Sequence, residues 1–316
     1  MKIIVTGGAG FIGSHICKRL LDAGNEVFCL DSFITGNPRN LDQLKDNSNF
    51  HLFEQDINVP LKPEVMAAIG KVDQIYNLAC PASPADYREI PLQTLWVNAA
   101  GVKNMLEIAA KQDSAILHAS TSEVYGDPLQ HPQKETYFGN VNPIGERSCY
   151  NEGKRFAESM AMVYYKDFKF PLKIARIFNT YGANMRKMDG RVIPEFINKA
   201  LHGEPLRIYG DGKQTRSFCY IDDMVDGLIA LMQTPRDFTG PVNIGNADEI
   251  SIQELAQKII TLTASTSLIS YAPRPEDDPV QRQPDLTLAS KTFGFKPKIA
   301  IAEGLKTTVE YFKRFQ

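Results

Sequence analysis

Apolar and polar positions come in alternating blocks through the first half of the chain. Short runs rich in β-branched residues (KIIVT, EVFCLD, DQIYNLA and SAILHAS) are separated by segments with helical periodicity, such as FIGSHICKRLLDAG. Strands that alternate with helices are typical of βαβ units, in which helices cover both faces of a parallel sheet. The pattern predicts an α/β fold with a doubly wound parallel sheet.

The pattern changes near residue 180. Glycine and proline become frequent in NTYGANMRKMDGRVIP and GEPLRIYGDGKQTRS, and helical patterns such as SIQELAQKIITL lie between such stretches. We therefore expect a first domain over residues 1–178 and a smaller, loop-rich region over 179–316. Some elements, at about 216–240, are expected to return to the first domain. No internal repeat or long linker is present, which predicts one compact unit.

Composition excludes several classes of partner. The chain has 316 residues, of which 43% are hydrophobic, so it can bury a sizeable core. Its 35 basic and 37 acidic residues are interspersed, which argues against a nucleic acid or a membrane surface. No signal peptide precedes the first strand and no apolar run is long enough to span a bilayer, so we expect a soluble protein.

The five cysteines are odd in number, scattered and without metal-type spacing. This favours reduced thiols in the cytoplasm and predicts no metal site. We interpret all five as small buried hydrophobic residues: Cys17, Cys29, Cys80, Cys149 and Cys219.

The segment VTGGAGFIGSH places three glycines (Gly7, Gly10 and Gly13) between a predicted strand and a predicted helix. Glycines there permit a tight turn and a close approach of the backbone to a pyrophosphate, and the helix N-terminus favours negative charge. A glycine-rich turn alone is weak evidence, but Asp31 ends the next strand, where it suits an adenosine ribose. Its carboxylate would repel a 2′-phosphate. We therefore expect a Rossmann-type domain that binds NAD and not NADP.

Tyr150 and Lys154 lie four residues apart in a helical pattern, which places both side chains on one face. A tyrosine ionises near pH 10, so it acts as a base at neutral pH only if a neighbouring positive charge stabilises its phenolate. Lys154 supplies that charge. An exposed helical pair is the ordinary alternative, but this pair follows both the glycine turn and the strand that ends in ASTSEVYG.

These motifs, in this order, resemble the extended branch of the short-chain dehydrogenase/reductase superfamily. The resemblance implies that a Thr, Tyr and Lys set acts on a sugar hydroxyl, with Thr121 as the hydroxyl donor. It also implies that Asp56 and Ile57 lie beside the adenine, and that the stretch NLAC passes the cofactor. The implied cofactor-binding residues are Gly7, Gly10, Phe11, Ile12, Gly13, Asp31, Asp56, Ile57, Leu78, Tyr150 and Lys154.

Ser122 and Glu123 separate the chemistries of this branch. The 4,6-dehydratases carry an Asp and then a Glu, and here the Asp position is Ser122. The Thr, Ser, Glu pattern instead resembles the UDP-glucuronate decarboxylases, also called UDP-xylose synthases. The stretches LACPASPADY, HPQKE, GNVNPIGERSCYNEGKR, ARIFNTYG and YGDGKQTRSF also resemble that family. A surface position for Glu123 is the minor alternative, because the segment ends a strand at the ligand-binding edge.

The resemblance implies conversion of UDP-glucuronate to UDP-xylose. Oxidation of C4 creates a ketone β to the carboxylate, and such acids lose carbon dioxide through an enolate. Tyr150 and Thr121 would stabilise the enolate oxygen, and Glu123 would manage the proton that C5 then takes. Release of a UDP-4-keto pentose with NADH is the first alternative. A 4,6-dehydratase or a 4-epimerase is a further alternative, less favoured than these two decarboxylase reactions.

The resemblance also assigns the substrate side, where the diphosphate, the uracil and the sugar carboxylate require cations and an amide. Arg282 would hold the sugar carboxylate and counts among the catalytic residues. Ala100 and Ala183 stand where the family often has a Thr-like residue and a proline, which bears on fine substrate selection. A homodimer is implied through the helices near residues 91–111 and 150–167. The implied substrate-binding residues are Tyr87, Thr121, Asn179, Arg191, Tyr209, Arg216 and Arg282.

Overall fold

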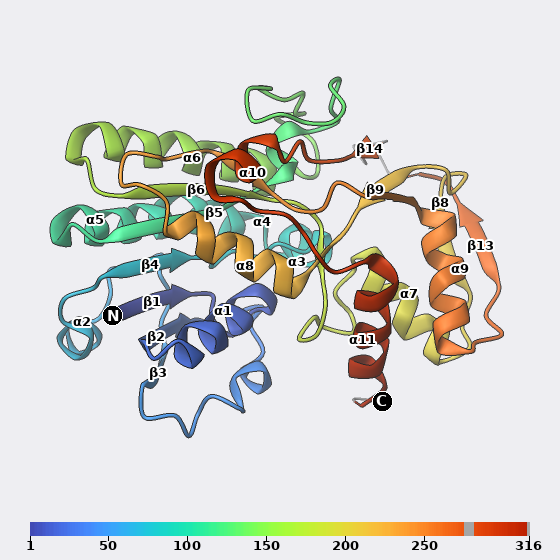
Figure 1. Ribbon diagram of the computed structural model, residues 1–316, viewed down its shortest axis with the longest axis horizontal. Coiled ribbons are helices and arrows are strands. Elements are labelled where there is room, and N and C mark those ends of the chain that lie inside the picture. The colour runs from blue at the N-terminus through green and yellow to red at the C-terminus, as the bar shows by residue number, and fades with distance from the viewer. Residues whose placement is uncertain (275–280, 315–316) are drawn as a thin grey trace.

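A seven-stranded parallel sheet forms the centre of the computed structural model, which describes residues 1–274 and 281–314 (Figure 1). The strand order is β11-β6-β5-β4-β1-β2-β3, and every neighbouring pair is parallel. The strands are β1 (Lys2–Thr6), β2 (Glu26–Asp31), β3 (Phe50–Glu54), β4 (Gln74–Asn77), β5 (Ala115–Thr121), β6 (Leu172–Ile177) and β11 (Val242–Ile244). The prediction of a doubly wound Rossmann-type sheet is confirmed. The order of strands reverses between β1 and β4, where such sheets open a crevice at their carboxyl ends.

Helices cover both faces of the sheet because each presents one apolar stripe to it. One face is covered by α1 (Phe11–Asp22) and α8 (Ile221–Met232), which pack on each other, with α10 (Thr287–Phe293) against α8. The other is covered by α2 (Pro63–Ile69), α5 (Val102–Gln112) and α6 (Ser148–Phe168). Before α5 lie α3 (Pro84–Glu89), α4 (Pro91–Trp96) and one π-helical turn, η2 (Val97–Gly101). Two short 3-10 turns, η1 (Pro38–Leu41) and η3 (Ser122–Tyr125), follow β2 and β5.

The second region holds more strand than its glycine- and proline-rich sequence predicts. Its strands are only two to four residues long, too short for an alternating pattern to be visible in the sequence. They are β7 (Thr180–Tyr181), β8 (Leu206–Tyr209), β9 (Thr215–Ser217), β10 (Cys219–Tyr220), β12 (Glu249–Ser251), β13 (Ile269–Ala272) and β14 (Gln281–Arg282). Its helices are α7 (Val192–Leu201), α9 (Ile252–Thr263) and α11 (Ile301–Lys313). A capping box between Ser251 and Glu254 begins α9, within the predicted helix.

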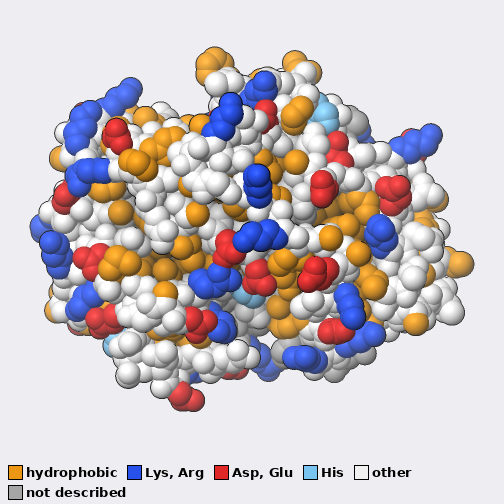
Figure 2. Space-filling view, viewed as in Figure 1, with side chains coloured by type: hydrophobic (Ala, Val, Ile, Leu, Met, Phe, Trp, Pro, Cys, Tyr) orange, Lys and Arg blue, Asp and Glu red, His pale blue; other side chains and the backbone are white. Residues whose placement is uncertain are grey.

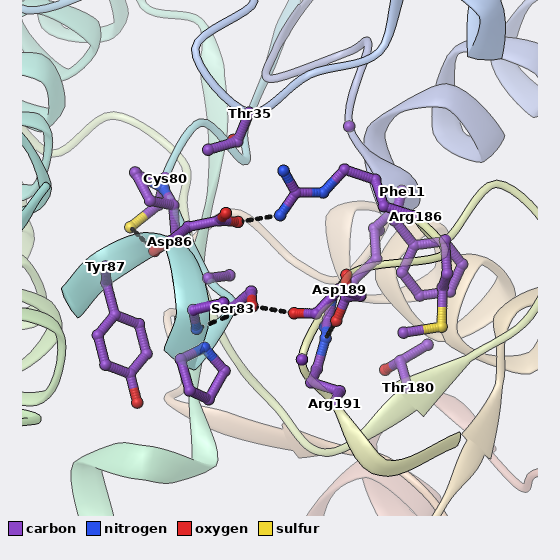
Figure 3. A pocket seen from close by; sticks show the side chains of 18 of the residues that line it. Phe11, Thr35, Cys80, Ser83, Asp86, Tyr87, Thr180, Arg186, Asp189 and Arg191 are labelled. Atoms are coloured by element: carbon purple, nitrogen blue, oxygen red, sulfur yellow. Dashed lines mark hydrogen bonds and ion pairs between the residues drawn. The ribbon is translucent and has the colours of Figure 1, made fainter. Parts of the chain in front are cut away.

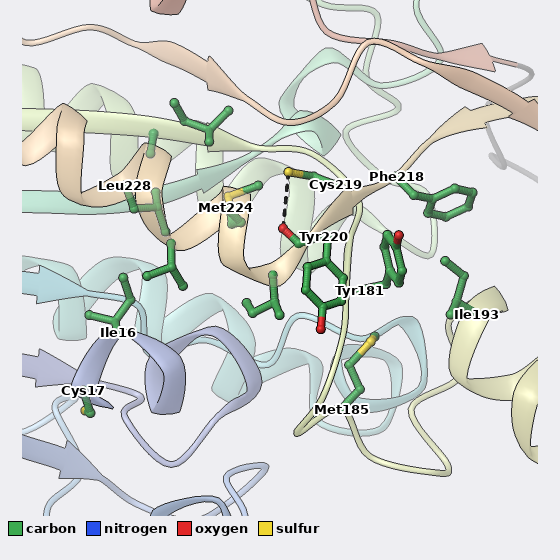
Figure 4. Packing of buried hydrophobic residues seen from close by; sticks show 14 of the residues in the cluster. Ile16, Cys17, Tyr181, Met185, Ile193, Phe218, Cys219, Tyr220, Met224 and Leu228 are labelled. Carbon is green, nitrogen blue, oxygen red and sulfur yellow. Dashed lines mark hydrogen bonds between the residues drawn. The ribbon is translucent and has the colours of Figure 1, made fainter. Parts of the chain in front are cut away.

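One apolar core joins the two regions. Figure 4 shows Ile16 of α1 and Met224 and Leu228 of α8 in the same buried cluster as Tyr181 and Ile193 of the second region. The chain also returns to the sheet, because α8 packs beside α1 and β11 pairs with β6. This last strand lies just beyond the returning segment expected at about 216–240. The domain boundary at residue 178 stays a prediction.

All five cysteines are unpaired thiols. Four are buried, as predicted, but Cys80 is only partly buried and lines a cleft, so its interpretation as a core residue was wrong. Within the described residues, no helix has both the length and the apolar character needed to cross a bilayer. On the face shown in Figure 2, acidic and basic side chains are intermixed over the surface, as the sequence predicts.

Candidate active site

A cleft of about 640 Å³ lies between the carboxyl ends of the sheet and the second region. It is lined by residues from the glycine turn after β1, the ends of β2, β4 and β5, the start of α6, and the second region. Every site residue predicted from the sequence lines this cleft. The arrangement follows from the topology, because parallel strands bring their carboxyl ends to one edge.

The glycine turn packs too closely against its neighbours to carry side chains at Gly7 and Gly13. Gly7 has φ +68°, and a Cβ atom there would lie 2.8 Å from the Cα of Ala79. A Cβ at Gly13 would lie 2.1 Å from the carbonyl oxygen of Gly7, so α1 packs directly on the turn. Gly10 is the N-cap of α1 and provides no side-chain cap, which leaves the first amides of the helix available to an anion.

Asp31 lies buried at the end of β2, where its carboxylate accepts hydrogen bonds from the amides of Ala9 (2.9 Å) and Phe33 (2.8 Å). Burial raises the pKa of Asp31, and these two amides counteract the rise. Each carboxylate oxygen keeps acceptor capacity for the hydroxyls of a ribose. Asp56 follows β3, and its carboxylate closes an Asx turn by accepting from the Asn58 amide (2.8 Å). Ile57 and Leu78 complete this end of the cleft.

The glycine cradle, the uncapped start of α1 and the acid at the end of β2 fit a dinucleotide with an unmodified adenosine ribose. Gly7, Gly10 and Gly13 would hold its pyrophosphate. Asp31 would hold its ribose. Phe11 and Ile12 line the same end of the cleft.

Thr121, Tyr150 and Lys154 meet where β5 and α6 face each other. All three are buried, and the Tyr150 hydroxyl shares a hydrogen bond with the Thr121 side chain. Lys154 Nζ donates to the carbonyl oxygen of Ala119 (2.8 Å) and lies 5.9 Å from the centre of the Tyr150 ring. Burial raises the pKa of Tyr150 in the free protein, and the hydrogen bond to Thr121 opposes this rise. The three side chains predicted as a set are therefore brought together.

Tyr87, on α3, stacks on Tyr150. Their ring centres are 5.1 Å apart and the rings are nearly parallel, at 7°. The Tyr87 hydroxyl is buried and has no hydrogen-bond partner among the described residues, so it is available to a ligand in the cleft. Cys80 packs beside this pair, with its sulfur 3.3 Å from the Asn98 amide nitrogen.

Glu123 is held between two arginines inside the protein. Its carboxylate accepts from Arg282 Nη1 (2.7 Å) and from Arg147 Nη1 (3.3 Å), and all three side chains are mostly buried. Burial by itself raises the pKa of Glu123, but the charges of Arg282 and Arg147 outweigh it, and the pKa is lowered. Glu123 is thus an ionised residue of the site and not a surface residue.

Arg282 presents two further donors that the protein does not satisfy. Its Nε and Nη2 are buried without a hydrogen-bond partner among the described residues. A buried guanidinium edge with no acceptor is costly unless a ligand supplies one, and a carboxylate matches its geometry. This is the strongest indication in the cleft of an anionic ligand beside Glu123.

Arg147 is not among the residues predicted individually from the sequence, although it lies in the stretch NPIGERSCY. It directly precedes α6, three residues before Tyr150, and it lines the cleft. Its position at the start of the helix that carries Tyr150 and Lys154 was a usable signal. Only the fold shows that it meets Glu123.

The other predicted substrate-binding residues also line the cleft. Arg216 is buried on β9 and donates to the carbonyl oxygen of Thr215 (2.9 Å). Arg191 forms a two-point ion pair with Asp189. Tyr209, at the end of β8, is partly exposed, and Asn179 follows β6. Their roles toward a ligand stay predictions.

Residues 183–191 are here called the strap, and Figure 3 shows Arg186 and Asp189 of this segment facing Asp86 and Ser83 in the cleft. Arg186 pairs with Asp86 of α3, and the Ser83 hydroxyl donates to the carbonyl oxygen of Asp189. At its other end the strap contacts the start of α1, through a hydrogen bond from Asn184 to Ser14 (3.0 Å).

Comparisons with known proteins agree with this geometry. The model of the NAD dependent epimerase/dehydratase family matches residues 3–245. UDP-glucuronic acid decarboxylase 1 of Arabidopsis thaliana is 48% identical over 313 residues, which are 99% of this chain and 70% of that protein. The protein of the same name from Danio rerio is 47% identical over 99% of this chain and 73% of its own length.

Among solved structures, UDP-glucuronic acid 4-epimerase from Bacillus cereus, in complex with UDP-glucuronic acid and NAD, is similar throughout. The TM-score is 0.90 at 29% sequence identity, and the match covers 100% of both chains. The likeness therefore includes the second region as well as the sheet.

Proposed function

The chain belongs to the NAD dependent epimerase/dehydratase family, and from this premise we propose that it decarboxylates UDP-glucuronate to UDP-xylose. The cofactor is NAD. One observation carries the proposal: the unsatisfied edge of Arg282 lies in the same cleft as Thr121, Tyr150 and Lys154. The cleft thus combines groups that oxidise an alcohol with a receptor for a carboxylate. Relatives named UDP-glucuronic acid decarboxylase, at 47–48% identity, support the same reaction.

The first step removes the C4 hydroxyl proton of the glucuronate ring. Tyr150 is the base, Thr121 orients the hydroxyl, and the ammonium of Lys154 stabilises the phenolate. The glycine cradle and Asp31 would hold NAD, which would supply a hydride acceptor and donor for C4 and a positive ring that favours the Tyr150 phenolate. The Tyr87 ring packs on Tyr150 and holds it in place.

The second step follows from the ketone at C4, which lies β to the sugar carboxylate. The C5–C6 bond breaks, carbon dioxide leaves, and its electron pair forms an enolate whose oxygen is stabilised by Tyr150 and Thr121. No base is needed for this step. Arg282 Nε and Nη2 hold the carboxylate in position until it leaves.

Glu123 controls delivery of the proton that C5 accepts next. Because Arg282 and Arg147 lower its pKa, Glu123 is a carboxylate in the free protein and becomes a strong acid whenever it is protonated. Ser122, which stands between Thr121 and Glu123, has no acidic group to expel a 6-hydroxyl. This favours decarboxylation over 4,6-dehydration.

Proton NMR of the purified protein with UDP-glucuronate and a trace of NAD tests the proposal. We expect a UDP-xylose anomeric signal without lasting absorbance of NADH, because the cofactor is oxidised and reduced within one cycle. Formation of a 4-keto pentose with stoichiometric NADH would indicate an oxidative decarboxylase. Formation of UDP-galacturonate would indicate a 4-epimerase. Unchanged UDP-glucuronate would refute the proposal.

A homodimer is also part of the proposal, supported by large exposed apolar side chains on two helices that pack together. Leu92 and Trp96 of α4 are 67% and 61% exposed, and Phe156 and Val163 of α6 are 53% and 54% exposed. Covering such a patch is typical of a subunit interface. Sedimentation velocity should show a dimer for the native protein and a monomer for Trp96→Glu, and a native monomer would refute it.

The unpaired cysteines support a cytoplasmic location. Cell fractionation tests this, and recovery of the protein outside the cytoplasm would contradict it.

A further inference from the structure

A second cavity, of about 260 Å³, lies behind Glu123. Here it is called the side chamber. Three residues, Glu123, Arg147 and Arg282, line both this chamber and the main cleft. They therefore form the partition between the two spaces.

The side chamber is polar and reaches the surface. Asn140 and Asn142 line it and are exposed, so the chamber opens to solvent at the loop after η3. That loop folds back on the end of η3 through backbone hydrogen bonds, from Asn140 to the Tyr125 carbonyl (2.9 Å) and from Asp127 to the Asn140 carbonyl (3.1 Å). A polar, open space of this size holds several water molecules.

Asn151 shows that water is needed inside the chamber. It lies on α6, four residues after Arg147, and is 93% buried, since its exposed fraction is 7%. Its Oδ1 accepts no hydrogen bond from any of the described residues. A buried amide oxygen without a partner is costly, and water in the chamber supplies the missing donor.

Decarboxylation consumes one proton from solvent, so the active site needs a route by which that proton arrives. The proton that leaves the C4 hydroxyl returns when C4 is reduced, so these two transfers cancel. Carbon dioxide carries no proton away, and C5 gains one in place of C6. A sugar bound in the main cleft would cover Glu123 on that side and block bulk water there. Among the described residues, the side chamber is the other space that reaches Glu123.

We propose that water in the side chamber delivers this proton through Glu123 to C5, with Asn151 as a positioning residue for that water. The proposal rests on the proposed decarboxylation. A chamber water takes a proton from solvent, passes one on to the Glu123 carboxylate, and is left as water. Glu123 then gives the proton to C5, the C5–H bond forms, the enolate becomes the 4-ketone, and Glu123 returns to its ionised form.

Asn151→Leu tests the proposal, since leucine has a similar shape but cannot bind water. We expect kcat to fall about tenfold and its solvent deuterium isotope effect to rise, because delivery of the proton becomes rate-limiting. KM for UDP-glucuronate should stay within about twofold, because Asn151 does not line the main cleft. Asn151→Ser keeps an acceptor and should recover most of the rate.

Asn142→Trp is the second variant, because it narrows the exposed end of the chamber without altering the core. It should also raise the isotope effect. Glu123→Gln, which removes the relay, should give the largest loss. A lower kcat with an unchanged isotope effect in Asn151→Leu and Asn142→Trp would mean a purely structural role and would overturn the inference. Native rates in these two variants would overturn it as well.

Failure of the proposed function has a different outcome. In that case the native protein leaves UDP-glucuronate unchanged in the same assay. If the native protein forms UDP-xylose and the Asn variants behave as native, decarboxylation stands and only the side chamber proposal falls.

Discussion

Tyr150→Phe is expected to lower kcat by about 10²–10⁴-fold, the contribution of a positioned acid–base group. Phenylalanine keeps the stacking on Tyr87 but removes the hydroxyl that would take the C4 proton beside Lys154. The rate of UDP-xylose formation measures the effect. The amount of bound NAD, measured after its release by denaturation, should stay near that of the native protein, because the glycine cradle and Asp31 are unchanged.

Tyr76→Phe is the matched control for this experiment. Tyr76 is also a buried tyrosine, but it lies on β4 and does not line the cleft. Its variant should keep near-native activity. More than a tenth of native activity in a well-folded Tyr150→Phe protein would refute the role of Tyr150 as the base.

Arg282→Gln is expected to weaken UDP-glucuronate binding by about 100-fold. The change removes the buried Nε and Nη2 edge and also the ion pair with Glu123, and loss of a buried charged hydrogen-bond partner costs about 2–5 kcal/mol. Calorimetric titration with UDP-glucuronate and with UDP-xylose measures the effect. UDP-xylose lacks the carboxylate, so its affinity should change only a few-fold.

Arg236→Gln is the control, because its ion pair with Asp113 lies on the exposed surface. It should leave both affinities unchanged. Arg282→Lys should fall between native and Gln, since lysine keeps the charge but not the planar fork. Equal weakening of both nucleotide sugars in Arg282→Gln would mean that Arg282 does not recognise the carboxylate.

The sequence predicted features whose signals are local. The strands and helices of the sheet show their period within a few residues, and the glycines that precede α1 act within one turn. Tyr150 and Lys154 share one helical face for the same reason. The family resemblance also predicted Glu123 and Arg282 as site residues. They are 159 residues apart in the sequence and yet form an ion pair.

Other features depend on contacts between distant segments and left no local signal. The pairing of Arg186 with Asp86 joins residues 100 positions apart, and the side chamber exists only when α6 meets the loop after η3. Cys80 looked like a small core residue because its type is usually buried, and only the position of α3 shows that it lines the cleft.

The return of α8 and β11 to the sheet determines how the protein folds. A cut after residue 178 would leave the sheet without its edge strand β11 and would expose the face of α1 that α8 covers. The second region would in turn lose the apolar cluster that it shares with α1. The two halves therefore depend on each other for their cores, and we expect them to unfold together.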